Sequence, residues 1–117
     1  MGTIHIKKRD GRHLNLLVAG ARDVVHLPRA RAMPTVPRTI VSSTLAERVA
    51  RGFGRSRWVD AGPFGRLKGP AVKVSIAIDG HTAVDVSALV ADLPNGARIV
   101  VGADIPDRLG PRVSTDP

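Results

Sequence analysis

The sequence contains no cysteine and no tyrosine, and its aromatic side chains amount to one tryptophan and two phenylalanines among 117 residues. Without cysteine, disulfide bonds and thiolate metal sites are excluded. With so few aromatic residues, the hydrophobic fraction of 43% consists mainly of Val, Ile, Leu and Ala. Because β-branched aliphatic residues favour strands, we expect a β-rich core of small aliphatic side chains.

Long apolar runs are also missing. No segment approaches the roughly 18 apolar residues that a membrane span needs, and "MGTIHIKKRDG" lacks the apolar segment of a signal peptide. We therefore expect a cytoplasmic protein without a membrane partner. The length predicts one domain over residues 1–110, followed by a disordered tail over residues 111–117.

Acidic residues are scarce, since 10 Asp and Glu face 18 Lys and Arg and the net charge is +8. Such a balance attracts nucleic acid or acidic partners. However, the basic residues are scattered along the chain and few aromatic side chains are available to stack on bases. A basic nucleic-acid-binding β-barrel is therefore one alternative, and a solvated arginine-rich surface is the other interpretation.

The first half of the chain shows the alternation of apolar and polar residues that is typical of strands. Residues 3–8 and 13–20 flank the turn sequence "DGR" and predict a first hairpin. A further strand is expected over residues 22–27. We expect it to end at Pro28, because proline cannot donate a hydrogen bond to a sheet.

A long hairpin is expected in the second half. In "AVKVSIAI", residues 71–78, the apolar side chains fall on one face, and Asp79-Gly80 is a strong hairpin turn signal. The chain returns through "TAVDVSALVA", residues 82–91, with the same alternation. We therefore predict that these two segments pair in antiparallel fashion.

One short helix is marked by its ends. Thr44 and Glu47 have the spacing of a capping box, in which each side chain accepts from a free backbone N–H of the first turn. Leu45 and Val49 share one face and are expected to be buried. Gly52 is expected to end the helix in a left-handed conformation.

Two further segments follow from composition. "FGRSRWVDAGPFGRLKGP", residues 53–70, is rich in Gly, Pro and Arg and is typical of a mobile hairpin or loop. "DIPDRLG", residues 104–110, predicts a short helical turn with Asp104 as its cap and Pro106 near its first position.

Taken in order, these elements resemble the retropepsin-like aspartic protease family of bacterial type. The resemblance covers about residues 14–110 and depends on "SSTLAERVARG" and on "IVVGADIPDRLG", which is similar to the family's closing motif. It implies an all-β, retropepsin-like closed barrel with one short helix after the active-site loop region and a short C-terminal helical turn. The family's closing motif has two hydrophobic residues followed by a glycine, and Val100, Val101 and Gly102 correspond to them.

The resemblance also implies a flap hairpin and a homodimer. The flap corresponds to about residues 58–68, and its expected flap or groove residues are Trp58, Val59, Phe64 and Gly65. Members of this family dimerise because each chain contributes half of the active site. An extended peptide would bind in the groove under the flaps, as an added strand.

The catalytic motif of the family is not recognisable. An aspartic protease needs one Asp-Thr/Ser-Gly loop from each subunit, because two carboxylates that share a proton activate the water. Counting back from "TIVSS" places residues 33–35 at that motif, whereas counting forward from the preceding strands places residues 29–32 there. Neither alignment contains an aspartate. The degenerate loop thus comprises Arg29, Ala30, Arg31, Ala32, Met33, Pro34 and Thr35.

"WVDAG" offers the one alternative catalytic loop, Asp60-Ala61-Gly62. Against it, Asp60 precedes the closing Gly102 by only about forty residues, and the expected strand and helix do not follow it. The other interpretation is that Asp60 and Gly62 shape the bend of the flap.

Three hypotheses follow. The first is a catalytically inactive retropepsin-like module that forms a dimeric scaffold or binds a peptide or protein in its groove. The second is an active aspartic endopeptidase that uses Asp60, and the third is the nucleic-acid-binding barrel. We expect no cofactor and no metal, because the four histidines show no ligand spacing.

Overall fold

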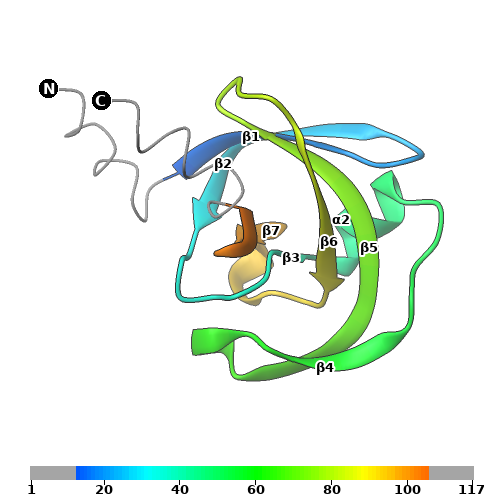
Figure 1. The fold of residues 1–117 in the computed structure, drawn as a ribbon, viewed down its shortest axis with the longest axis vertical. Coiled ribbons are helices and arrows are strands. Elements are labelled where there is room, and N and C mark those ends of the chain that lie inside the picture. The colour runs from blue at the N-terminus through cyan, green and yellow to red at the C-terminus, as the bar shows by residue number, and fades with distance from the viewer. Residues whose placement is uncertain (1–12, 106–117) are drawn as a thin grey trace, which may run out of the picture.

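The computed structural model describes residues 13–105, and six of its strands form a small closed β-barrel of mixed direction (Figure 1). The order around the barrel is β1-β2-β7-β3-β6-β5, and β5 pairs back with β1 to close it. The β2–β7 and β3–β6 pairs are parallel, and the others are antiparallel. The strands are β1 (His13–Ala19), β2 (Val24–Ala32), β3 (Ile40–Val41), β5 (Arg66–Ile78), β6 (Val84–Val90) and β7 (Ile99–Val101). Within residues 13–105, the prediction of a closed β-barrel with one short helix is confirmed, and the fold is mostly β.

A seventh strand, β4 (Ser56–Asp60), pairs with the first five residues of β5. This hairpin, residues 56–70, is called the arm below. Its tip contains the 3-10 helix η1 (Gly62–Phe64). In Figure 1 the arm extends along the end of the barrel opposite the β1–β2 hairpin. The segment rich in Gly, Pro and Arg therefore forms a hairpin, because the first five residues of the long strand β5 pair with β4.

The long hairpin has the predicted form. Val74 of β5 lies opposite Val86 of β6, and both are buried, whereas Lys73 between the buried positions is exposed. In the turn, Asp79 and Gly80 have φ angles of 49° and 84°. Positive φ at both central residues is the geometry that favours Asp-Gly in tight hairpins.

Strand β2 continues through Pro28, so the prediction that it ends there is wrong. In the β1–β2 register, Asn15 of β1 faces two residues of β2, Pro28 and Arg29, which constitutes a β-bulge. A bulge tolerates proline because the extra residue is released from the regular hydrogen-bond ladder. β2 therefore reaches Ala32, four residues beyond the expected end.

The helix α2 (Ser43–Val49) is present, but its cap differs from the prediction. The Oγ of Ser42 accepts the hydrogen bond of the Leu45 amide at 3.2 Å, so Ser42 is the N-cap and Thr44 lies inside the first turn. The cap lies two residues earlier because β3 ends at Val41 and the helix follows directly.

The C-terminal end of α2 also differs. Ala50 closes the helix in an extended conformation, with φ of −104°, and its amide donates to the Ala46 carbonyl. Gly52 does not have a positive φ, so the predicted left-handed stop is wrong. The prediction of a buried face is confirmed for Leu45 and Val49.

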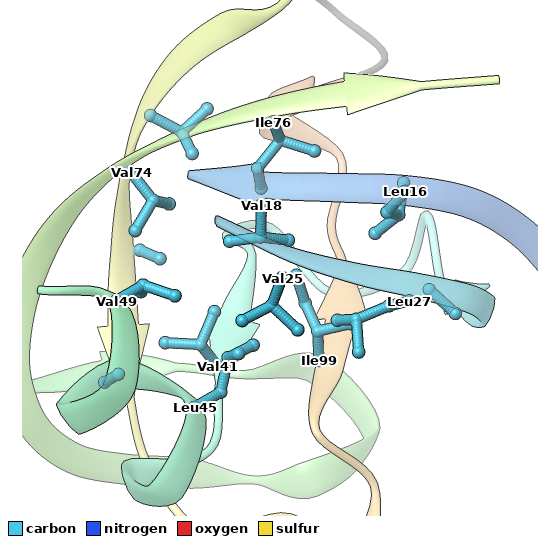
Figure 2. Close-up of a cluster of buried hydrophobic side chains, with 14 of the residues drawn as sticks. Leu16, Val18, Val25, Leu27, Val41, Leu45, Val49, Val74, Ile76 and Ile99 are labelled. Carbon is cyan, nitrogen blue, oxygen red and sulfur yellow. The ribbon is translucent and has the colours of Figure 1, made fainter. Parts of the chain in front are cut away.

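Two groups of buried side chains stabilise the fold. The main core fills the barrel and is closed by α2; Figure 2 shows how side chains from opposite strands meet there. Its labelled members are Leu16, Val18, Val25, Leu27, Val41, Leu45, Val49, Val74, Ile76 and Ile99. The second group, the arm cluster, lies between arm and barrel and contains Val36, Ile40, Ala61, Leu89 and Val100, with Met33, Val59, Phe64 and Leu67 packed on it.

Some expectations fall outside the described residues. These are the first strand of the N-terminal hairpin, most of the helical turn over residues 104–110, and the tail over residues 111–117. Asp104 and Ile105, at the start of that turn, have helical backbone conformation.

Candidate functional site

The segment between β2 and β3 forms a loop directly beside β7. The Met33 amide donates to the Val101 carbonyl at 2.8 Å, and the Val36 amide donates to the Met33 carbonyl at 2.9 Å. Residues 33–35, which one alignment places at the catalytic motif, lie in this loop. Residues 29–32, which the other alignment places there, lie within β2.

The loop ends at Thr39, which is fully buried. Its hydroxyl donates to Oδ1 of Asp104 at 2.8 Å and accepts from the Gly102 amide at 3.1 Å. The Thr39 amide also donates to the Asp104 carboxylate. The loop is therefore fixed to the segment that follows β7, an interaction between distant positions that sequence patterns do not indicate.

The closing motif is packed at the same place. Val100 and Val101 are buried in β7, which runs between β2 and β3. A Cβ on Gly102 would lie 2.6 Å from the carbonyl carbon of Arg38 and 2.7 Å from the Val36 carbonyl oxygen. Only glycine allows the chain to cross the loop this closely.

The tip of the arm rests on the loop. Gly62 has a φ of 59°, and a Cβ there would lie 2.3 Å from the Thr35 carbonyl oxygen. The Gly62 amide donates to Oδ1 of Asp60 at 3.0 Å, and Ala61 is 1% exposed. The Asp60 carboxylate therefore shapes the turn of the tip, and its side chain is on the surface.

A groove of about 740 Å³ opens beside the loop. Its walls are residues 26–31 of β2, Met33, residues 93–100 and Phe64 from the arm. Residues 93–100 include the 3-10 helix η2 (Pro94–Gly96) and the start of β7. Sequence reasoning missed this wall, because nothing in its local pattern indicates that it faces β2.

The predicted site residues are only partly brought together. Of the degenerate loop, Arg29, Ala30, Arg31 and Met33 line the groove, whereas Ala32, Pro34 and Thr35 do not. Of the four expected flap or groove residues, Phe64 lines it. Val59 packs in the arm cluster, and Gly65 lies in the tip turn with φ of 79°.

The charge of the groove is one-sided. Its lining contains His26, Arg29, Arg31 and Arg98, and among residues 13–105 it contains neither Asp nor Glu. Asp60 is not part of the lining. The described part of the groove thus presents cations together with apolar side chains.

Trp58 lies elsewhere on the arm. Its side chain is 58% exposed, and Arg66 and Lys68 approach its ring centre to 5.7 and 6.0 Å. These distances are those of cation–π contacts. The three side chains form an exposed basic and aromatic surface, called the Trp58 surface below.

Fold and site together define a small mixed closed β-barrel with an arm and a basic groove at its rim. Neither a scan against family models nor a search of curated proteins finds a match for this chain.

Within residues 13–105, no three His, Asp or Glu side chains are grouped as metal ligands. In the same part of the chain, no helix is long and apolar enough to cross a membrane.

Proposed function

We propose that this protein is a non-catalytic, retropepsin-like module that binds an extended peptide segment in the groove and acts as a homodimer. The observation that supports this most directly is that no Asp or Glu of residues 13–105 lines the groove, although the groove lies beside the loop of residues 33–38. At the two positions where the resemblance can place the Asp-Thr-Gly motif, the chain has residues 33–35, Met-Pro-Thr, or residues 29–32, Arg-Ala-Arg-Ala.

The β2 edge supports a peptide as the ligand. β2 pairs with β1 along its length, and on its other side it pairs with β7 at Arg31 and Ala32. Among residues 13–105, no strand pairs with that other side over residues 24–30. An open strand edge beside a groove suits addition of an extended chain, which supplies backbone hydrogen bonds, while pockets select side chains.

The absence of catalysis follows from the chemistry of the family. Two carboxylates must face each other and share one proton to activate water. Asp60, the aspartate in the only sequence that resembles the motif, accepts the Gly62 amide in the arm tip. Its carboxylate stabilises a turn and is not part of the groove lining.

The test is to incubate the protein with a degenerate decapeptide mixture between pH 3 and pH 7 and to analyse bound and free fractions by mass spectrometry. We expect enrichment of bound peptides without new termini. Pepstatin-sensitive cleavage that is lost in Asp60→Asn, and retained in the matched variant Asp92→Asn, would instead establish an aspartic endopeptidase.

The homodimer is tested separately by sedimentation velocity over a range of protein concentrations. We expect a species with the mass of two chains, about 25 kDa, from a chain of 12.4 kDa. A monomer at every concentration would rule out the proposed dimer but would not affect the proposal that the groove binds a peptide.

The Trp58 surface favours a second candidate function, the binding of single-stranded nucleic acid. An exposed aromatic ring flanked by cations offers stacking together with phosphate contacts. Filter binding across a salt series tests it. Phosphate contacts give an affinity that falls steeply with salt. At a fixed salt concentration, Trp58→Ala should bind more weakly than the wild type. A flat, weak response would remove this candidate.

A further inference from the structure

Two arginines of β2 lie on the same face of the strand beside the groove. Arg29 and Arg31 are exposed, and Ala30 between them is buried. Residues two apart on a strand share a face and are separated by about 6.6 Å along it. The two guanidinium groups therefore repeat at the spacing of alternate residues in an extended chain.

A third arginine, Arg98, directly precedes β7 and lines the groove from the wall that faces β2. The parallel register pairs Arg31 with Val100, two residues after Arg98. Three exposed cationic side chains are thus gathered in the groove by two segments that are distant in sequence.

These charges have no counter-charge in the described part of the chain. Within residues 13–105, none of the three arginines has a side-chain hydrogen bond or an ion pair, and the one salt bridge is Arg48 with Asp23. Like charges gathered in one groove repel one another. A ligand with carboxylates would relieve this repulsion and bind the planar guanidinium groups in a bidentate way.

We infer that the groove selects acidic peptides, with Glu or Asp at alternate positions facing Arg29, Arg31 and Arg98. This inference rests on the proposed function, because it names the ligand class of the same groove. Between the acidic positions, apolar side chains of the peptide face Met33, Phe64 and Leu93, which also line it.

A nucleic acid would satisfy the same arginines with phosphates, but the rest of the groove favours a peptide. Among the described lining residues, Phe64 is the one Phe, Tyr or Trp, whereas proteins bind single-stranded nucleic acids by stacking successive bases on several aromatic side chains. The open edge of β2 supplies backbone hydrogen bonds that match a peptide.

The experiment measures fluorescence anisotropy with three labelled ten-residue peptides of alternating sequence, Glu-Val, Gln-Val and Lys-Val, at 50 and 300 mM salt. The full-length chain is used as wild type, as Arg31→Gln and as Arg31→Glu. Arg51→Glu is the matched control, because Arg51 is exposed and does not line the groove. Circular dichroism verifies that each variant is folded, and Arg98→Gln replaces either Arg31 variant if that variant is not.

We expect the Glu-Val peptide to bind at least tenfold more tightly than Gln-Val and the Lys-Val peptide to bind least. Arg31→Glu should reduce Glu-Val affinity at least tenfold, Arg31→Gln less, and Arg51→Glu less than twofold. Equal binding of Glu-Val and Gln-Val would overturn the acidic preference and leave the peptide groove intact. Equal losses in Arg31→Glu and Arg51→Glu would also overturn it, since they would indicate attraction by net charge alone.

Two other outcomes are distinguishable. If none of the three peptides binds, the proposed function fails and the inference fails with it. If a ten-residue oligothymidylate binds more tightly than Glu-Val and loses affinity in Arg31→Glu, the groove binds nucleic acid and the inference is overturned.

Discussion

Asp104 and Thr39 are 65 residues apart in sequence, yet both carboxylate oxygens of Asp104 accept hydrogen bonds from Thr39. The Thr39 amide donates to Oδ1 and Oδ2 at 3.0 and 3.1 Å, and the hydroxyl donates to Oδ1 at 2.8 Å. The same hydroxyl accepts from Gly102. This contact connects the loop on which the arm rests with the end of β7, so it supports one corner of the groove.

Replacing Thr39 by valine keeps the shape of the side chain but removes the hydroxyl, which donates to Asp104 and accepts from the Gly102 amide. Because Thr39 is fully buried, the Gly102 amide loses its acceptor in the protein interior. We expect the free energy of unfolding to fall by about 1–3 kcal/mol, measured by urea denaturation. Thr39→Ser, which retains the hydroxyl, should lose less. Equal losses in the two variants would contradict this role of the hydrogen bonds.

Contact between the arm tip and the loop predicts a difference between two glycines. Gly62 and Gly65 both have positive φ, but a Cβ on Gly62 would collide with the Thr35 carbonyl, whereas one on Gly65 meets nothing within 4 Å. Both alanine variants carry backbone strain, and Gly65, with φ of 79° and ψ of −151°, lies in a region that is essentially restricted to glycine. The collision with Thr35 is specific to Gly62→Ala, so the Val36 amide should exchange faster with solvent in that variant than in Gly65→Ala. Identical behaviour would show that the tip does not rest on the loop.

Asp60 should tolerate replacement by asparagine. The asparagine side-chain oxygen still accepts from the Gly62 amide, so stability should change little, whereas Asp60→Ala should lose about 0.5 kcal/mol as the turn loses that bond. The stabilities are compared by thermal unfolding. Because the carboxylate charge is not needed for binding in this account, Asp60→Asn should retain wild-type peptide affinity. A tenfold loss of affinity would place Asp60 in the binding site.

The surface pair of Asp23 and Arg48 predicts a small dependence of stability on pH. The hydrogen bond from Arg48, together with one from the Val24 amide, lowers the pKa of Asp23 below its ordinary value of 3.8. A carboxyl whose pKa is lowered by folding stabilises the folded state above its unfolded pKa, and this stabilisation is lost as the pH falls through the folded pKa.

Arg48→Gln should therefore be slightly less stable than wild type at pH 7, and the difference should shrink as the pH falls through the lowered pKa of Asp23. Denaturation curves at pH 7, 4 and 2.5 measure this. The effect should be small because both side chains are well exposed. A difference as large at pH 2.5 as at pH 7 would mean that Arg48 stabilises the protein in another way.

The elements that the sequence predicts well are those with local causes. The β5–β6 hairpin follows from the alternation of apolar and polar residues and from the Asp79-Gly80 turn. Both signals lie in one short, continuous stretch of sequence. The helix was also predictable, but not its cap, since Ser42, Ser43 and Thr44 are all good capping residues. The choice among them depends on where β3 ends, and this is set by the pairing of Val41 with Ile99.

The groove was less predictable because it depends on a parallel pairing between distant segments. Arg31 and Ala32 belong to β2 because they pair with β7. From the sequence alone, they could equally have belonged to the loop that follows. The passage of β2 through Pro28 depends on a bulge opposite Asn15. Neither fact leaves a local sequence pattern, so the sequence alone could not assign Arg98 to the same groove as Arg29 and Arg31.

The central claim, that the groove binds an acidic peptide without cleaving it, is tested most directly by a ¹H–¹⁵N NMR titration with the unlabelled Glu-Val peptide at pH 6. We predict shifts concentrated at residues 29–33, Phe64 and residues 93–100, and a peptide of unchanged mass after a day. Shifts centred on the Trp58 surface, or hydrolysis of the peptide, would contradict the account.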